Sequence, residues 1–175
     1  MTSDDMRRAV AHRVAALRAE RGLSLSELAR RAGIGKGSLS ELEAGQRNPT
    51  LDTLYAIAGQ LGVPLTALLG EQSGTEGTGE SIDVSLLHVE HHDDGATTEV
   101  FWLRLTPNGI RTSPAHGPGV IESLYVATGS VSAGPTGNER PAGPGETVTW
   151  VSDVAHTYRS GPRGTQAVLT IHSPG

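Results

Sequence analysis

The hydrophobic pattern of the sequence changes its period once, across a segment that contains no apolar residue. Before residue 70, apolar residues recur at intervals of three and four, as on one face of a helix. After residue 81 the chain breaks into short β-prone runs. The segment between them reads GEQSGTEGTGES, a composition typical of a flexible linker. The pattern therefore predicts two domains, residues 1–69 and 82–175, joined by a linker at 70–81.

Capping residues and glycines divide the first domain into five short helices. Ser24 to Glu27 has the form of a capping box, which starts a helix. Thr50 is a second N-cap, and Gly22, Gly33, Gly45 and Gly62 are stop signals. We expect an all-α bundle whose helices are one carrying Val10, Val14 and Leu17, then 24–32, 36–43, 51–61 and 64–69.

The second domain is predicted to be all β. Turn signals rich in Gly and Pro, such as Pro107-Asn108-Gly109 and Gly161-Pro162-Arg163-Gly164, separate runs of β-prone residues. Many short strands divided in this way are typical of a barrel or a sandwich. The expected strands are residues 82–91, 99–105, 120–127, 130–133, 147–151 and 166–172.

Charge divides along the same boundary. Residues 1–70 carry nine Lys and Arg against seven Asp and Glu, whereas residues 71–175 carry five against twelve. Only the first part is therefore an expected partner for nucleic acid. Cysteine is absent, which excludes disulfides and thiolate metal ligands. Because the sequence shows no apolar run of the ~18 residues that a membrane span needs and no signal-peptide pattern, we expect a cytoplasmic protein without membrane contact.

The second and third expected helices have the spacing of a helix-turn-helix. Gly33-Ile34-Gly35 joins them, and in such motifs the second helix enters the major groove of DNA. The segment from Gly22 to Thr50 resembles the Cro/XRE repressor family, and the resemblance extends to about Leu69. It implies a sequence-specific DNA-binding transcriptional regulator. The residues that carry it are Gly22, Leu28-Ala29, Gly33, Ser40, Leu42-Glu43, Gly45 and Arg47-Asn48-Pro49-Thr50.

This resemblance implies a role for each part of the motif. The amides of Leu25 and Ser26 would point at a phosphate, and Arg47 and Asn48 would hold the DNA backbone. Gly at the expected N-cap of the third helix replaces the usual Ser or Thr. The residues that would face the groove are Lys36, Gly37, Ser38 and Glu41, and bases or phosphate are the alternative contacts of Ser38 and Ser40.

The second domain resembles a cupin, a double-stranded β-helix. Gly109 to Gly129 is similar to the first cupin motif and Gly145 to His156 to the second, in which Asp153 stands where Gly is usual. Cupins bind a divalent metal through two His and a Glu of the first motif and a His of the second. The matching candidates here are His116, Glu122 and His156, so the site has at most three ligands.

The register of His116 is open at the level of sequence. Counted back from Glu122, it occupies a ligand position; counted forward from Gly109, it points to the other face of a strand. Metal ligation, binding of an organic effector without metal, and ordinary packing are the alternatives. The residues expected to line an effector pocket are Trp102, His116, Glu122, Tyr125, Trp150, His156 and Tyr158.

The combination resembles a family of bacterial transcriptional regulators in which the cupin senses a small molecule. It implies a homodimer that reads a pseudo-palindromic operator with half-sites about 34 Å apart, and no enzymatic activity. The main alternative is a cupin metalloenzyme similar to hydroxypropylphosphonate epoxidase, which uses non-haem iron, with a helical accessory domain. The spacing from His116 to Glu122 is longer than in that enzyme family. An antitoxin-like partner of a second protein is a further alternative.

Overall fold

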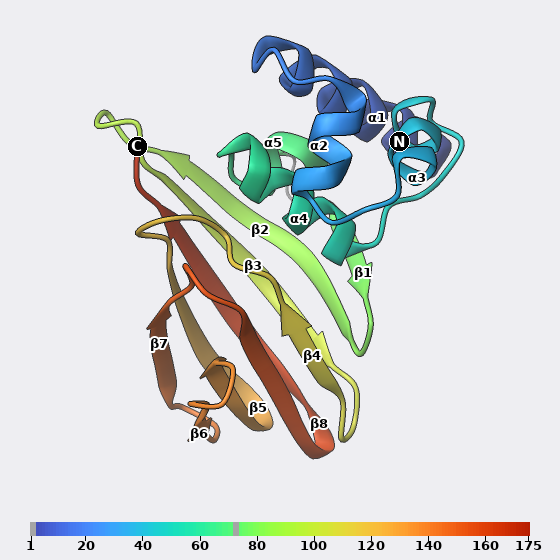
Figure 1. Cartoon of the computed structure of the whole chain (residues 1–175). Helices are drawn as coiled ribbons and strands as arrows, with labels where there is room; N and C mark the ends of the chain where they lie inside the picture. Colours follow the sequence, from blue (N-terminus) through green and yellow to red (C-terminus); the bar gives the residue numbers. More distant parts are fainter. Residues whose placement is uncertain (1–2, 72–73) are drawn as a thin grey trace. The chain divides into compact units, whose positions relative to one another are not determined.

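The computed structural model describes residues 3–71 and 74–175 of the chain. The chain divides into two compact units, Met1–Gly70 and Glu71–Gly175, here the helical unit and the β unit (Figure 1). Helices followed by an all-β unit confirm the predicted fold class. Among the described residues, none of the helices has both the length and the hydropathy to span a membrane.

The helical unit contains the five predicted helices. Ser24 caps the second, because its Oγ accepts a hydrogen bond from the Glu27 amide at 3.1 Å, and Thr50 caps the fourth in the same way at 3.3 Å. The third helix begins after Gly35 without a side-chain cap. The helices are α1 Ser3–Glu20, α2 Leu25–Arg31, α3 Lys36–Glu43, α4 Leu51–Leu61 and α5 Thr66–Leu69.

A tight turn and a small apolar core hold α2 and α3 together. Gly33 adopts a φ of +66°, a conformation that glycine takes at little cost. The Ile34 amide closes the turn by donating to the Ala29 carbonyl at 3.0 Å. The buried side chains beneath the turn are Val10, Val14, Leu28, Leu39, Leu42, Leu54 and Ile57. The apolar spacing read from the sequence therefore does produce the inward face of each helix.

The β unit is built from antiparallel strands. The hydrogen-bonded order is β1-β2-β3-β8-β5-β6, with β4 paired to β8 and β7 to β5. Figure 1 shows β2, β3 and β8 running side by side along the unit. The strands are β1 Glu76–Gly79, β2 Ile82–His91, β3 Thr97–Leu105, β4 Ile110–Ser113, β5 Ile121–Pro135, β6 Arg140–Ala142, β7 Thr147–Val151 and β8 His156–Ser173.

Part of the predicted linker is a strand. Residues 76–79 form β1, which pairs with β2, and the ladder begins before it where the Gly74 amide donates to the Leu86 carbonyl at 2.7 Å. An edge strand is held by main-chain hydrogen bonds and needs no apolar side chains. The polar composition of the segment therefore does not predict a strand. The linker prediction is therefore wrong for residues 76–79.

The strands β3, β5 and β8 are longer than predicted, and β4 and β6 were not expected. β5 continues through Gly129, where φ is +81° and the pairing with β8 shifts register on both sides. Such bulges bend a strand without ending it. The Gly161–Gly164 cluster likewise does not end β8; it only interrupts the pairing with β5 between Ser160 and Thr165.

The inner face of the β unit changes from apolar to polar along its length. Phe101, Leu103, Leu124 and Val126 are buried in the apolar part. Further along the same inner faces, buried positions carry polar side chains instead, which marks this region as the candidate site. These residues are Glu99, Arg111, Ser113, Glu122 and His156.

Candidate functional site

Helix α3 has a polar, exposed face opposite the apolar face that packs into the helical unit. Leu39 and Leu42 are fully buried against the rest of the helical unit. The sequence-predicted base-facing positions Lys36, Gly37, Ser40 and Glu41 are exposed, and Ser38 is half-buried. The helix is therefore anchored by one face and free to contact a partner with the other.

Arg47 lies over this surface rather than apart from it. Its Nη1 donates to Ser38 Oγ at 3.3 Å and lies 3.7 Å from Glu41 Oε2. The structure thus brings together three of the predicted DNA-binding residues, while Asn48 beside them is exposed. A hollow of about 200 Å³, which the sequence did not reveal, is lined by Ile34, Gly35, Ser38, Leu42, Arg47, Pro49 and Thr53.

The start of α2 combines first-turn amides with a charge cluster of one carboxylate and two guanidinium groups. Leu25 and Ser26 occupy the first turn, where helix amides have no intrahelical acceptor. Glu27 pairs with Arg30 at 2.9 Å and with Arg31 at 2.7 Å. The hydrogen bonds from Arg30 and then Arg31 lower the pKa of Glu27 to about 2. Glu27 therefore stays ionised and orients both guanidinium groups.

A cluster of His116, Glu122 and His156, here the triad, lies inside the β unit. Glu122 on β5 is fully buried, and its Oε1 lies 2.8 Å from His116 Nε2 and 3.1 Å from His156 Nε2. His116 lies in the loop between β4 and β5, where its amide donates to the Ser152 carbonyl at 2.9 Å. Because a loop has no strand alternation, His116 reaches Glu122, as the count back from Glu122 predicts.

Tyr158 and Trp150 complete the surroundings of the triad. Tyr158 donates a hydrogen bond to the other carboxylate oxygen of Glu122, Oε2. Trp150 on β7 lies directly opposite Glu122 in the ladder, and its ring centroid is 5.9 Å from that of His156 and 5.7 Å from that of Tyr158. Five of the seven residues predicted for the effector pocket therefore lie together.

The other two residues predicted for the effector pocket, Trp102 and Tyr125, lie apart from the triad. Tyr125 is 46% exposed and alternates with the buried Leu124 and Val126. Trp102 likewise alternates with the buried Phe101 and Leu103. Since successive side chains of a strand point to opposite faces, Trp102 and Tyr125 lie on the outer face of the sheet. Their assignment to the pocket is wrong.

Contacts within the triad stabilise the charged forms of its side chains. Burial raises the pKa of Glu122, but the contacts with His116 and then His156 outweigh burial and hold that pKa well below its usual range. Burial lowers the pKa of His156, but Glu122 and the Val154 carbonyl outweigh it, so the net pKa is raised. The buried carboxylate is therefore ionised, and positive charge beside it is favoured.

The triad also fits a divalent metal. One nitrogen or oxygen from each residue lies within 4.8 Å of the others. Glu122 Oε1 and His156 Nε2 are buried and have no hydrogen bond of acceptable geometry with any described residue, although they lie only 3.1 Å apart. His156 Nδ1 donates to the Val154 carbonyl at 3.1 Å, which leaves Nε2 unprotonated in the neutral ring. Two imidazoles and a carboxylate suit iron, manganese, nickel or zinc.

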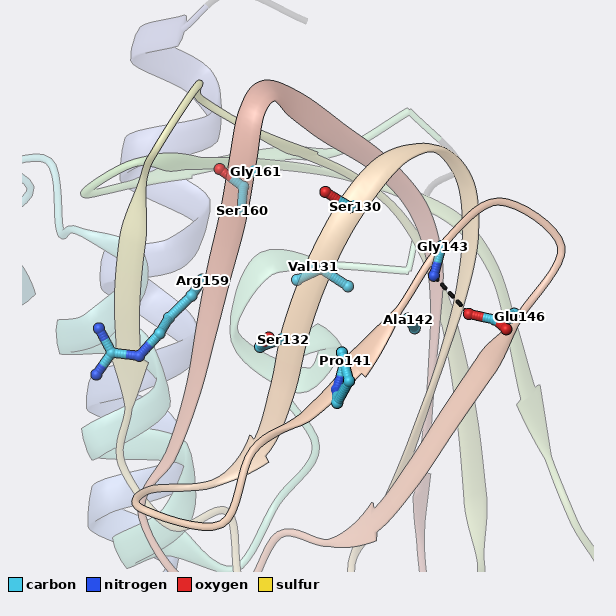
Figure 2. A pocket seen from close by; sticks show the side chains of 10 residues that line it. All are labelled: Ser130, Val131, Ser132, Pro141, Ala142, Gly143, Glu146, Arg159, Ser160 and Gly161. Carbon is cyan, nitrogen blue, oxygen red and sulfur yellow. Dashed lines mark hydrogen bonds between the residues drawn. The ribbon is translucent and has the colours of Figure 1, made fainter.

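A second hollow lies on the β unit away from the triad. Figure 2 shows this pocket of about 650 Å³, with Glu146 bonded to the Gly143 amide at 2.7 Å on one wall and Arg159 on the other. None of the predicted pocket residues lines it. The sequence carried no signal for it, because its lining is mostly small residues that also form ordinary turns and strands: Ser130, Val131, Ser132, Pro141, Ala142, Gly143, Glu146, Arg159, Ser160 and Gly161.

Comparison with known proteins assigns the family. A helix-turn-helix family model, HTH_3, matches residues 14–68. The HTH-type transcriptional regulator SutR of Escherichia coli (strain K12) is 32% identical over 164 residues, which cover 90% of this chain and 91% of SutR. The chain belongs to the XRE-type helix-turn-helix transcriptional regulators.

A solved structure of an HTH_3 family regulator extends the likeness to the whole chain. An HTH_3 family regulator from Vibrio cholerae has a TM-score of 0.83 and 25% identity, over 99% of this chain and 100% of that chain. The Cupin_2 domain of an XRE family regulator from Enterobacter cloacae has 28% identity and a TM-score of 0.48, over 55% of this chain and 100% of that chain. The predicted resemblance to XRE-type regulators is confirmed.

Proposed function

We propose that this XRE-type regulator binds a specific operator through its helical unit and a small-molecule effector through its β unit. One observation carries the proposal: a buried polar cluster, centred on Glu122, lies in the same chain as an exposed helix-turn-helix. A β unit built only for stability has no need of a buried carboxylate with two imidazoles, since such groups are costly to bury. We infer that the cluster is retained for binding.

In this proposal α3 enters the major groove. Lys36 donates to guanine, Glu41 accepts from cytosine, and Ser38 and Ser40 contact bases or phosphate. Gly37 allows close approach and reads no hydrogen bonds. Arg47 and Asn48 hold the backbone, and the amides of Leu25 and Ser26 bind a phosphate. The exposure of α3 and the position of Arg47 beside Ser38 support this assignment.

The proposed active form is a homodimer on a pseudo-palindromic site in the cytoplasm. Helix-turn-helix dimers place two recognition helices about 34 Å apart, one turn of DNA. Effector binding would shift the relative placement of the two helical units, with a coupling of about 1–3 kcal/mol. The net negative charge of the β unit repels the phosphates of nucleic acid, which leaves this unit for the effector.

His116, Glu122 and His156 would hold a divalent cation in this site. The ion would supply a positive charge that attracts an electron-rich group of the effector. Tyr158 would keep Glu122 oriented by its hydrogen bond to Oε2. A non-haem iron enzyme is the alternative use of the same residues, and the naming of SutR as a transcriptional regulator favours sensing over catalysis.

Selection of bound DNA from a random-sequence pool tests the proposal. The intact protein is compared with a folded double variant, Lys36→Ala with Arg47→Ala. We expect enrichment of a two-fold symmetric site that the variant loses. Failure of the folded wild-type protein to enrich any site would contradict operator binding and leave the enzyme and partner-binding alternatives.

A further inference from the structure

The indole N–H of Trp150 is a hydrogen-bond donor that the fold leaves without an acceptor. Trp150 is 6% exposed, and its Nε1 is buried with no hydrogen-bond partner in residues 3–71 and 74–175. An unsatisfied buried donor is destabilising, and most such donors in native proteins are satisfied by protein, water or ligand. The acceptor for this donor must therefore come from outside the described chain.

Glu122 is the nearest candidate in the ladder, but neither of its oxygens accepts from the Trp150 indole N–H. It stands opposite Trp150 across the β5–β7 pair. Its Oε2 accepts from Tyr158, and its Oε1 lies against the two imidazoles of the triad. The rings of His156 and Tyr158 contact the Trp150 ring. The Trp150 ring thus lies beside the triad, but no triad residue accepts a hydrogen bond from its indole N–H.

The charges around Trp150 favour an anionic acceptor. Arg111 is buried on β4, opposite Tyr158 in the ladder. Glu99 is buried in the same row as Glu122, on the other side of Ile171. If the triad holds a divalent cation, that ion and Arg111 would together exceed the charge of Glu122 and Glu99 by one positive unit. One negative charge on a ligand would balance this region.

We propose that the effector is a small oxyanion, a carboxylate or a phosphate-type group, and that one of its oxygens accepts a hydrogen bond from the Trp150 indole N–H. This inference rests on the proposed effector function of the β unit. A site with a fixed hydrogen-bond donor and a positive charge discriminates against ligands that lack an acceptor or a negative charge. Neutral analogues of the same shape therefore bind more weakly.

The indole resonances report directly on the proposed hydrogen bond. The chain has two tryptophans, so protein labelled with ¹⁵N-tryptophan gives two indole N–H signals, and the folded variant Trp102→Phe assigns them. Zinc-loaded and metal-free protein are titrated at constant ionic strength with acetate, inorganic phosphate or acetamide. Acetate and phosphate distinguish the two kinds of oxyanion, and acetamide is the neutral control.

We expect the Trp150 signal to move downfield and to saturate with acetate or with phosphate. Acetamide should need at least a tenfold higher concentration, and the Trp102 signal should not move, because Trp102 lies on the outer face. The absence of a saturable Trp150 shift with both anions would overturn the proposal. So would an equal response to acetamide.

A conservative variant supplies a second readout that does not use the indole signal. Trp150→Phe keeps a ring in the packing and removes the donor; Trp102→Phe is the matched control. Calorimetric titration with the better anion should give a Kd at least tenfold higher for the first variant and unchanged for the second. An unchanged Kd in folded Trp150→Phe would overturn the proposal.

Operator binding separates this inference from the function on which it rests. If the anion binds Trp150 but leaves operator affinity unchanged, sensing is contradicted and the anion site is supported. If a symmetric operator is enriched but neither anion binds, the anion site is contradicted and DNA recognition is supported.

Discussion

Arg18 on α1 and Glu43, the last residue of α3, form a two-pronged ion pair. The Nε–Oε1 distance is 2.7 Å and the Nη2–Oε2 distance is 2.8 Å. The same guanidinium donates from Nη1 to the Leu23 carbonyl at 2.9 Å, which ties in the turn before α2. The side chains are only 20% and 10% exposed, so water weakens the pair little. Arg18 therefore fixes the C-terminal end of α3.

Loss of this pair should destabilise the helical unit. We expect Arg18→Ala to lower the free energy of unfolding by about 1–3 kcal/mol, since the pair is charged, bidentate and shielded. Urea denaturation followed by helical circular dichroism measures the change. Arg30→Ala is the matched control: its pair with Glu27 is exposed to solvent, so the free energy of unfolding should not change measurably. Equal losses in the two variants would contradict the special role of Arg18.

Arg47 should contribute mainly sequence-independent affinity. Its removal eliminates one proposed phosphate contact, so the slope of log Kd against log salt should fall by about 1 for Arg47→Ala. The loss should be similar on the operator and on unrelated DNA. Affinity measured at several salt concentrations tests this. A loss confined to the operator would show instead that Arg47 reads bases.

Glu27 should titrate far below an ordinary glutamate. Its pKa is lowered to about 2 by Arg30 and then Arg31, so the pairs are intact above about pH 4.5 and are lost as the pH falls toward 2. Titration of the Glu27 side-chain carboxyl signal by NMR measures this directly. Arg31→Ala should raise the midpoint. A midpoint near 4.5 in the wild-type protein would contradict the ion-pair geometry.

Metal affinity should depend on Tyr158 as well as on the triad. Tyr158→Phe removes the hydrogen bond that orients Glu122 and should weaken zinc or cobalt binding by about 10–100-fold, whereas His156→Ala should abolish it. Calorimetry and elemental analysis of the dialysed protein measure both effects. Undiminished metal content in folded His156→Ala would show that the triad is not the metal site.

Gly129 should not tolerate a side chain. At a φ of +81°, a Cβ on this residue would clash with the Gly164 carbonyl oxygen, so Gly129→Ala should cost about 2–4 kcal/mol. Gly137 has a φ of +85° with nothing within 4 Å, so Gly137→Ala should cost only about 1 kcal/mol. Tryptophan fluorescence during urea unfolding compares the two. Equal costs would mean that β5 and β8 separate easily at this bulge.

Local signals predicted the helical unit well. Ser24 and Thr50 cap their helices, and Gly33 makes its turn, through contacts that span only a few residues. Such contacts depend on the nearby sequence alone, so they can be read without knowing the fold. The pairing of Arg18 with Glu43 joins residues 25 positions apart and was not foreseen.

The β unit was predicted less completely because its organisation depends on long-range pairing. Alternation shows that Trp102 and Phe101 face opposite ways, but only the assembled sheet decides which face is inner. The proximity of His116 to Glu122 followed from the family resemblance, not from periodicity. The orphan donor of Trp150 depends on β7 lying beside β5, which no local pattern encodes.

The pairing of β1 with β2 shortens the covalent connection between the units. Six residues separate the end of α5 from the start of β1, where twelve residues of free chain were expected. Fully extended, six residues reach about 20 Å. Detaching β1 from the sheet edge would add about 13 Å of reach. The four-residue ladder between β1 and β2 therefore controls the length of free chain that joins the helical unit to the β unit.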